Sequence, residues 1–534
     1  MEKRYLPTGN EMLSIPKLNE ETAGIEDITF LHMGFKGLVE LRGSEDKALI
    51  EPFVEVDGEG ACLAGLSWKR LQFWVPHFTG RAGPIFVEGI ILTPIKERGF
   101  AYRMLLRNGD KEPHAIKFGL QGCWGSAWHC VNEDKEIEGT KHCFVSPWND
   151  SLIFDMRCGV PLFCFAPMSS DKACASNFKN TEQGVTYRLE HTGTLDAGES
   201  KEVVIYWGLG FEEVAAATSA KEMLRQGYQY EEAMTLSWLR ARTFWADDIK
   251  LRELYNTNLF FCIFFSTGVT LDTEELVLVT SRSPRYYVSA AYWDRDSLLW
   301  SFPAVLDADP GLARQMLEYV FGRQRRNIGV HSRYIDGTVL EPGFELDELM
   351  APVLALEQYI DATGDQTFLD EQDVKKGLRS IYEKLGAHQN PRLGLYETFL
   401  QPTDDERVYP YLTYDNVLVW KGLNAMARLC PEEFSALENE ADAVSDAIWR
   451  HSVKEKDGKR FFAWSVDVTG NYDVYDEPPG SIQLLPRLGF CLAEDVVYQN
   501  TVDLIRSPSY PYSFAGCRFA EIGCPHARIR GCSV

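Results

Sequence analysis

A change in the spacing of apolar residues near residue 211 is the feature that most constrains how this chain folds. Between about residues 25 and 210, short runs of alternating apolar and polar residues are separated by Gly, Asp, Asn and Pro, which is typical of antiparallel strands. From residue 211 onward, the apolar residues recur at helical spacing. Strands followed by helices predict two segregated domains. We therefore expect an N-terminal β-sandwich over residues 1–210 and a helical domain over residues 211–534.

The helical part divides into paired segments joined by loops rich in Asp, Gly, Pro and aromatic residues. The apolar spacing predicts helices over residues 249–266, 296–306, 310–323, 346–363, 371–387, 415–429, 434–452, 480–492 and 494–506. Helix pairs that recur along the chain without a strict sequence repeat are typical of an (α/α) toroid. The predicted fold class is therefore β plus α, with a sandwich followed by a toroid.

Length and charge restrict the possible functions. A chain of 534 residues is too long for one compact core. Its net charge of −24 argues against nucleic acid as a partner and favours a neutral substrate. The 13 cysteines form no CxxC pair, and no apolar run resembles a signal segment or is long enough to cross a bilayer. These features predict a cytoplasmic protein without a membrane partner, and they leave the oligomeric state open.

Two expected helices begin with charged residues that suit a sugar site. Arg295 and Asp296 can exchange hydrogen bonds with sugar hydroxyls, and the neighbouring Trp293 can cover the apolar face of a pyranose. Glu345 and Asp347 stand at the start of a later helix, in the same position relative to it. The alternative interpretation is ordinary helix capping, surface ion pairing and helix-dipole chemistry. The shared position at helix starts favours a site.

A long loop over residues 394–416 carries most of the remaining carboxylates. Glu397, Asp404 and Asp405 lie there among tyrosines and phenylalanine, and a carboxylic acid held near apolar rings keeps its proton to higher pH, as a general acid requires. The alternative is a solvated acidic turn. Glu477 opens another segment, where it either lines a sugar subsite or belongs to a proline-capped helix start. No metal-binding, phosphate-binding or serine-nucleophile motif occurs, so we expect carboxylate chemistry without a metal or cofactor.

Four segments, in this order, resemble the metal-independent exo-α-mannosidases of glycoside hydrolase family 125 and, more distantly, glucoamylase-like six-hairpin glycosidases. Residues 293–297 read WDRDS, 344–349 read FELDEL, and 399–405 read FLQPTDD, followed by Tyr409, Tyr411 and Asn416. Residues 500–526 end in IGCPH. The resemblance implies an (α/α)6 toroid that hydrolyses terminal α-linked mannosides with inversion, with an oligosaccharide or glycoside as substrate.

The resemblance also implies roles for individual residues. The acid corresponds to Asp404 or Asp405, whereas the glucoamylase pattern places it at Glu397. Together with the local chemistry above, the candidate sugar-binding residues are Trp293, Arg295, Asp296, Glu345, Asp347, Tyr409, Tyr411, Asn416, Glu477 and His526.

The chain departs from the family at several places. The family has Leu where Asp294 stands and Arg where Leu400 stands, and its members lack a strand domain of this size. The family base lies in a later H-E-S-F segment, whereas this chain reads ARIRGCSV after His526. Inversion uses two carboxylates, so without the base we expect a truncated toroid that binds sugar but hydrolyses it poorly. We also expect the first helices to expose apolar residues, namely Leu236, Leu239, Phe244 and 259–265.

Three other functions stay open. One is a glucoamylase or debranching-type α-glucosidase, the second is a non-catalytic carbohydrate-binding remnant, and the third is a phosphorylase. The sequence fixes neither the sugar nor the linkage.

Overall fold

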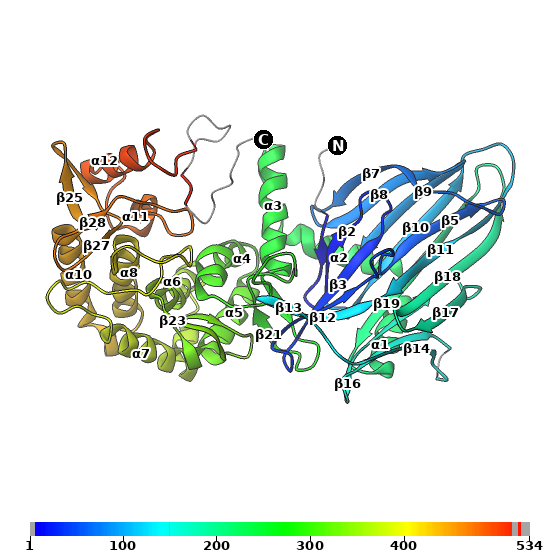
Figure 1. Ribbon diagram of the computed structural model, residues 1–534, viewed down its shortest axis with the longest axis horizontal. Coiled ribbons are helices and arrows are strands. Elements are labelled where there is room, and N and C mark those ends of the chain that lie inside the picture. Colours follow the sequence, from blue (N-terminus) through cyan, green and yellow to red (C-terminus); the bar gives the residue numbers. More distant parts are fainter. Residues whose placement is uncertain (1–5, 149, 515–521, 525–534) are drawn as a thin grey trace. The chain divides into compact units, whose positions relative to one another are not determined.

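The computed structural model describes residues 6–148, 150–514 and 522–524. The chain forms two compact units, Met1–Ala291 and Tyr292–Val534, which we describe separately (Figure 1). Strands give way to helices between β19 (Ser200–Gly210) and α1 (Glu213–Gln226), close to the predicted position. The division between the units falls later, so the first three helices belong to the unit that holds the sheets.

Three antiparallel sheets make up most of the first unit. The six-stranded sheet has the order β1 (Thr8–Gly9), β2 (Ser14–Leu18), β3 (Ile25–His32), β4 (Gly37–Arg42), β12 (Ser126–Val131), β13 (Glu133–Glu136). The eight-stranded sheet has the order β14 (Thr140–Val145), β15 (Leu152–Arg157), β16 (Pro161–Ser169), β19, β10 (Gly99–Asn108), β9 (Ile85–Leu92), β8 (Val75–Ala82), β7 (Ala64–Leu71). The five-stranded sheet has the order β17 (Ala175–Thr181), β18 (Gly184–Leu195), β11 (His114–Trp124), β5 (Glu51–Val56), β6 (Glu59–Gly60).

One hydrophobic core joins these sheets, as expected for a β-sandwich. Its members come from all three sheets, and the fully buried Trp207 of β19 stacks on Phe165 of β16 with 4.9 Å between ring centroids. Strands such as β3, β16 and β19 are buried along most of their length, so apolar side chains on both of their faces are removed from water. The predicted antiparallel strand domain is therefore confirmed.

Three helices and a short hairpin complete the first unit. They are α1, α2 (Tyr228–Arg242), α3 (Ile249–Phe264), β20 (Thr267–Val269) and β21 (Leu276–Leu278). The expectation that the first helices expose apolar residues is wrong for Leu239 and Leu259, which are fully buried, whereas Phe244 is 43% exposed. The physical reason lies within this unit, since Trp74 of the strand region stacks on Phe264 with 5.3 Å between ring centroids.

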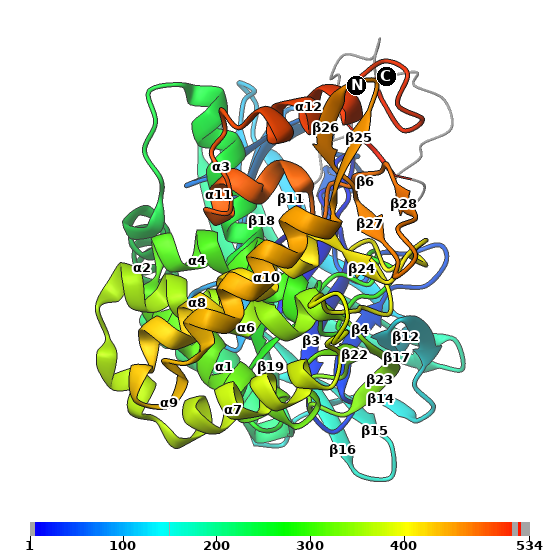
Figure 2. The same cartoon turned by 90° about the vertical axis from the view of Figure 1, so that its left-hand side faces the viewer.

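The second unit consists mainly of helices (Figure 2), and these helices have two different burial patterns. The helices α6 (Leu346–Thr363) and α8 (Thr413–Leu429), which pack on each other, are buried along most of their length. By contrast, α7 (Gln372–Gly386) and α10 (Leu437–His451) bury one stripe and expose the other. A helix that is buried all round is an inner helix and an amphipathic one is an outer helix, so this unit has the two layers of an (α/α) toroid.

The remaining elements of the second unit surround these helices. They are the π-helix η1 (Arg295–Ser301), α4 (Phe302–Ala308), α5 (Pro310–Gly322), η2 (Gln324–Asn327), β22 (Val330–Arg333), β23 (Val339–Phe344), η3 (Gln366–Asp370), β24 (Tyr411–Leu412), α9 (Pro431–Phe434), β25 (Val453–Lys456), β26 (Lys459–Phe462), β27 (Ser465–Val466), β28 (Tyr472–Asp473), η4 (Ile482–Leu484), α11 (Leu485–Leu488) and α12 (Val496–Ile505). No helix in the described part of the chain is both long and apolar enough to cross a membrane.

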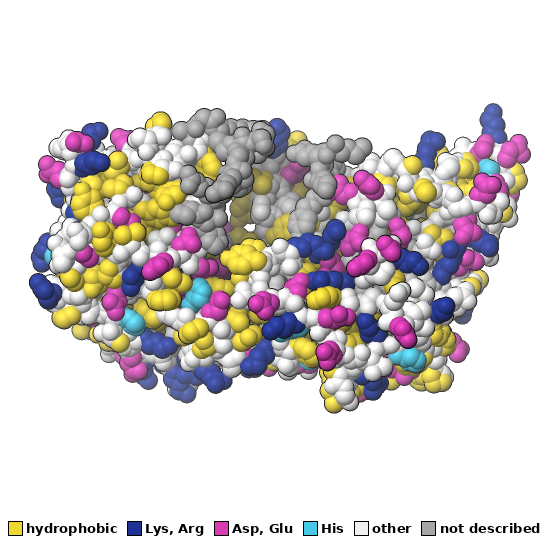
Figure 3. All heavy atoms as spheres, viewed as in Figure 1, with side chains coloured by type: hydrophobic (Ala, Val, Ile, Leu, Met, Phe, Trp, Pro, Cys, Tyr) yellow, Lys and Arg dark blue, Asp and Glu magenta, His cyan; other side chains and the backbone are white. Residues whose placement is uncertain are grey.

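Surface charges of both signs are interspersed on the face shown in Figure 3, where Lys and Arg side chains lie among Asp and Glu side chains. The expected truncation of the toroid concerns residues after His526, which lie outside the described residues.

Candidate active site

The start of η1 carries a buried arginine that contacts carboxylates from three segments. Arg295 Nη1 donates to Glu345 Oε2 at 2.9 Å and to Asp347 Oδ2 at 3.0 Å, and its Nη2 donates to Asp404 Oδ1 at 2.5 Å. Its Nε lies 3.8 Å from Asp296 Oδ2. Only 1% of the arginine is exposed. We call these five residues the Arg295 cluster. Three of the four segments that resemble family 125 therefore meet at one place, around the starts of η1 and α6.

A second set of buried contacts fixes the start of η1. Glu348 of α6 accepts hydrogen bonds from the backbone N–H groups of Asp294, at 2.5 Å, and Arg295, at 3.2 Å. Asp294 in turn pairs with Arg333 of β22 and accepts from the Tyr292 hydroxyl. Because these groups are buried and mutually satisfied, the Arg295 guanidinium is held in one orientation.

His331 of β22 contacts two carboxylates of the Arg295 cluster, Glu345 and Asp404. Its Nδ1 pairs with Glu345 Oε1 and lies 3.9 Å from Asp404 Oδ1. Burial alone would raise the pKa of Glu345, but Arg295 and His331 together lower it below its ordinary value. Glu345 is therefore a carboxylate at neutral pH, which suits a hydrogen-bond acceptor for sugar hydroxyls.

Asp404 lies in a strained loop that Glu477 anchors. Its φ of +62° places a non-glycine residue in the left-handed region, which the surroundings must stabilise. The preceding Thr403 donates its backbone N–H and its hydroxyl to Glu477, at 3.0 and 2.8 Å, and the Tyr475 hydroxyl also donates to Glu477, at 3.1 Å. Burial raises the pKa of Glu477 to about 8. The two contacts with Thr403 hold the loop that presents Asp404, and the contact with Tyr475 fixes the Glu477 carboxyl.

Burial also changes the protonation of Asp404. Burial, followed by the charge of Glu345, raises its pKa above the ordinary aspartate value, although Arg295 and His331 oppose the shift. The Asp404 side chain is still 28% exposed, so a ligand can reach it. Of the two neighbouring aspartates, Asp404 is the one that accepts a hydrogen bond from Arg295.

Three aspartates occupy the first turns of η1, α6 and α8. They are Asp296, Asp347 and Asp415. The positive end of the helix dipole favours carboxylates at such positions. Even so, burial raises the pKa of all three, to about 7 for Asp296 and well above the ordinary value for Asp415. The helix starts thus surround the site with carboxyl groups that hold protons at higher pH than usual.

Trp300 is an accessible aromatic residue beside the Arg295 cluster. Its ring centroid lies 5.9 Å from the Arg295 guanidinium carbon, and 44% of the residue is exposed. Its indole N–H donates to the backbone carbonyl of Pro479 at 3.1 Å, which fixes the ring. The sequence analysis did not select Trp300. Its spacing of four residues from Asp296 on one helix was a signal that could have found it.

The other predicted sugar-binding residues have different surroundings. Trp293 is 3% exposed and packs edge-on against His331, with 5.5 Å between ring centroids. Tyr411 is buried, and its hydroxyl accepts from Asn390 at 2.6 Å. Asn416 uses its amide on backbone groups of residues 396 and 412. Their contacts indicate that Tyr411 and Asn416 shape the loop around the site.

The remaining candidates lie apart from the cluster or outside the described residues. Glu397 is half exposed and lies 3.9 Å from His388, and it is not among the carboxylates that contact Arg295. Tyr409 is partly exposed, and Asp405 follows Asp404 in the loop. His526 lies outside the described residues.

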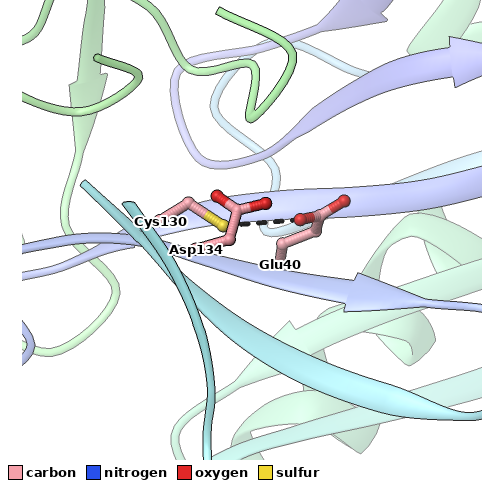
Figure 4. Close-up of side chains that lie close together, drawn as sticks. All are labelled: Glu40, Cys130 and Asp134. Carbon is pink, nitrogen blue, oxygen red and sulfur yellow. Dashed lines mark hydrogen bonds between the residues drawn. The ribbon is translucent and has the colours of Figure 1, made fainter. Parts of the chain in front are cut away.

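Three groups of described residues could offer ligand atoms to a metal ion. Two of them, His331–Glu345–Asp404 and Glu345–Asp347–Glu348, belong to the site, and the third is Glu40–Cys130–Asp134 in the first unit (Figure 4). In the third group, Arg42 Nη2 lies 2.5 Å from Glu40 and 2.6 Å from Asp134. In the site, Arg295 holds the carboxylates in the same way. A metal ion at either place would have to displace an arginine.

Comparison with known proteins relates this geometry to a family. The family model described as metal-independent alpha-mannosidase (GH125) matches residues 382–532, a range that includes Asp404, Asp405 and Glu477. The resemblance to this family is confirmed. No curated protein matches the chain.

Solved structures relate to the chain mainly through its fold. A bacterial glucoamylase complexed with acarbose has a TM-score of 0.59 at 12% identity, covering 95% of this chain and 78% of its own. A putative kojibiose phosphorylase from the human microbiome has a TM-score of 0.54 at 11% identity, covering 83% and 66%. A metal-independent α-mannosidase of Streptococcus pneumoniae, in a non-productive complex with α-1,6-mannobiose, has a TM-score of 0.47 at 19% identity, covering 53% and 78%. The fold and the family match together class the chain with the glycoside hydrolases.

The raised pKa of Asp296 predicts a pH-dependent change in relative stability. Its folded value of about 7 lies above the ordinary value, so the folded chain keeps a proton that the unfolded chain releases. The contribution of Asp296 to the free energy of unfolding therefore falls as pH rises from the ordinary aspartate pKa to the folded value of about 7. The fall is at most about 1.4 kcal/mol per pH unit. Asp296→Asn should gain stability relative to the wild type between pH 5 and 8.

Thermal denaturation of both proteins at several pH values checks this expectation. The exposed Asp442 of α10 provides a matched control, because Asp442→Asn should show a constant difference from the wild type. A constant difference for Asp296→Asn as well would show that Asp296 is ionised in the folded chain at pH 5.

Proposed function

We propose that this chain is an inverting exo-α-mannosidase with Asp404 as its general acid. The observation that carries the proposal is the contact of Asp404 with the buried Arg295, within the segment that the GH125 model matches. The carboxyl is accessible, its raised pKa favours the protonated form, and it belongs to the same cluster as Arg295, Glu345 and Asp347. An acid, donors and acceptors for hydroxyls, and an aromatic surface are the parts that a glycosidase needs.

The proposal gives each residue a step, which its contacts support. Asp404 gives its proton to the glycosidic oxygen as the bond to the terminal sugar breaks, and Arg295 Nη2 stabilises the carboxylate that results. Glu345, Asp347 and Asp296 accept hydrogen bonds from hydroxyls of the terminal sugar. A water molecule then attacks the anomeric carbon from the opposite face, activated by a second carboxylate. The contacts of Glu477 with Thr403 and Tyr475 favour a positioning role for it over that of the base.

Trp300 supplies the surface that covers the apolar face of the sugar in this proposal. Trp300→Ala should raise KM for an α-mannoside about 2- to 10-fold, corresponding to the 0.5–1.5 kcal/mol of an aromatic contact, and Trp300→Phe should raise it less. Trp245→Ala, which removes a 72% exposed tryptophan in the first unit, is the control. Steady-state kinetics on an aryl α-mannoside measure the effect. Equal KM values for Trp300→Ala and Trp245→Ala would remove Trp300 from the substrate site.

The assay for the proposed function follows products rather than substrate loss. The purified chain is incubated with α-1,6-mannobiose, and proton NMR records the anomer that appears first. We expect β-mannose, the product of inversion, without a requirement for phosphate. Cleavage of maltose instead would indicate an α-glucosidase, phosphate-dependent cleavage would indicate a phosphorylase, and sugar binding without turnover would indicate a binding remnant.

The same assay tests the expected slow turnover. A rate near the ~10 s⁻¹ typical of enzymes would show that the chain contains a working base despite the lack of an H-E-S-F segment. A rate far below that value would agree with the expectation.

A further inference from the structure

Asp415, in the first turn of α8, carries the least satisfied carboxyl group of the site. The residue is fully buried, and neither of its carboxylate oxygens has a hydrogen-bond partner among the described residues. Buried polar groups normally have partners, because an unmade hydrogen bond lowers stability. The fold alone thus gives no reason for an aspartate at this position.

The neighbouring carboxylates show how unusual this is. Glu345, Asp347, Glu348 and Glu477 are equally buried, and each accepts hydrogen bonds from named protein groups. Asp415 lies close enough to Asp347, Glu345 and Glu477 for their charges to act on it. Asp415 therefore lies near the carboxylates of this site.

The surroundings also decide the chemical form of Asp415. Burial and the nearby negative charges raise the pKa of its carboxyl well above the ordinary value, which favours the neutral form of the group. A neutral carboxylic acid both donates and accepts a hydrogen bond. A sugar hydroxyl does the same, so the two groups are complementary. A divalent cation prefers ionised carboxylates, and Arg295 already pairs with the charged ones nearby.

We propose that Asp415 is a substrate-binding residue whose carboxylic acid group hydrogen-bonds a hydroxyl of the terminal sugar. This assignment rests on the proposed glycosidase function. In this proposal η1, α6 and α8 play the same role, because each contributes the aspartate of its first turn to the sugar site. In the free protein, burying the Asp415 carboxyl without hydrogen-bond partners costs free energy, and the hydrogen bond to the substrate then offsets this cost.

The test compares Asp415→Asn and Asp415→Ala with the wild type and with Asp442→Asn, a change at an exposed position of α10. Each protein is examined by thermal denaturation and by kinetics on an aryl α-mannoside and its four monodeoxy analogues. We expect Asp415→Ala to lower kcat/KM about 10- to 100-fold, the range for a lost hydrogen bond in a desolvated site. Asp415→Asn should keep part of the activity and melt no lower than the wild type.

The deoxy analogues identify the contact. On the analogue that lacks the hydroxyl bound by Asp415, the wild type and Asp415→Ala should have the same kcat/KM, since the contact is absent in both. If Asp415→Ala loses the same factor on all five substrates, or loses nothing on any, the proposal is wrong while the glycosidase function stands.

Two further outcomes would also overturn the proposal. A clear drop in melting temperature for Asp415→Asn would show that the carboxyl serves the fold. A rise in wild-type melting temperature with Ca²⁺ or Mg²⁺ alone, lost in Asp415→Asn, would show a cation site instead. If the wild type neither binds nor cleaves any glycoside, the proposed function fails and the sugar contact fails with it.

Discussion

Arg295→Met should lower the free energy of unfolding by about 3–5 kcal/mol at pH 7, the cost of removing one partner from a buried ionic group. The substitution keeps the length of the side chain but leaves Glu345, Asp347 and Asp404 without the guanidinium that donates to all three. Chemical denaturation monitored by tryptophan fluorescence measures the change.

The pH dependence gives this prediction a second readout. In the wild type the pKa of Glu345 is lowered, so its contribution is present above the unfolded value of about 4.3 and is lost as pH falls through the folded value. The difference between Arg295→Met and the wild type should therefore shrink below pH 4.

Arg314 of α5 is the matched control for this change. It pairs with Asp365, Glu318 and Glu371 but is 30% exposed, so Arg314→Met should cost about 1 kcal/mol or less. Equal losses in the free energy of unfolding for the two variants would show that the Arg295 cluster contributes no more to stability than a network of surface ion pairs.

Asp404→Asn should lower kcat/KM on α-1,6-mannobiose by about 10²- to 10⁴-fold, the range for loss of a general acid. The amide keeps the size of the side chain, so Thr403 and Glu477 still hold the loop, but it has no proton to give. Steady-state kinetics on the disaccharide measure the loss.

Asp405→Asn and Glu397→Gln are the controls for the acid. Each should reduce kcat/KM about tenfold or less, since neither residue contacts Arg295 in the way that Asp404 does. If Glu397→Gln abolishes activity while Asp404→Asn does not, the glucoamylase-like alignment is correct and the assignment of Asp404 is wrong.

Much of the helical unit could be predicted because apolar spacing and first-turn acids mark helix starts. The helix expected over 346–363 is α6, Leu346–Thr363. The helix expected over 296–306 is instead the π-helix η1, Arg295–Ser301, followed by α4, Phe302–Ala308. A π-helix adds one residue to a turn without changing the local composition, so spacing cannot reveal it.

Site residues that belong to a recognisable motif were predicted, and those whose role depends on burial and on the fold were missed. Arg295, Glu345 and Asp404 were found because each belongs to a recognisable segment. His331 was missed because it lies on a hairpin strand, and only the fold brings it to Glu345. Asp415 was missed because a first-turn aspartate is ordinary helix chemistry until its burial and lack of partners are known.

The tryptophans show the same limit. The sequence analysis selected Trp293 as a sugar platform from its place in the WDRDS segment. The structure buries Trp293 against His331 and leaves Trp300 accessible. Which of two nearby tryptophans faces solvent depends on packing against other segments, here on the hydrogen bond from Trp300 to the carbonyl of Pro479.

The central claim is that Asp404 protonates the departing group, and the dependence of the Asp404→Asn defect on that group tests it most directly. Mannobiose has a poor leaving group that needs a proton, whereas 2,4-dinitrophenyl α-mannoside has a good one that leaves without it. We predict a loss of about 10²- to 10⁴-fold on mannobiose and a rate close to the wild type on the dinitrophenyl substrate. Equal losses on both substrates would contradict the account.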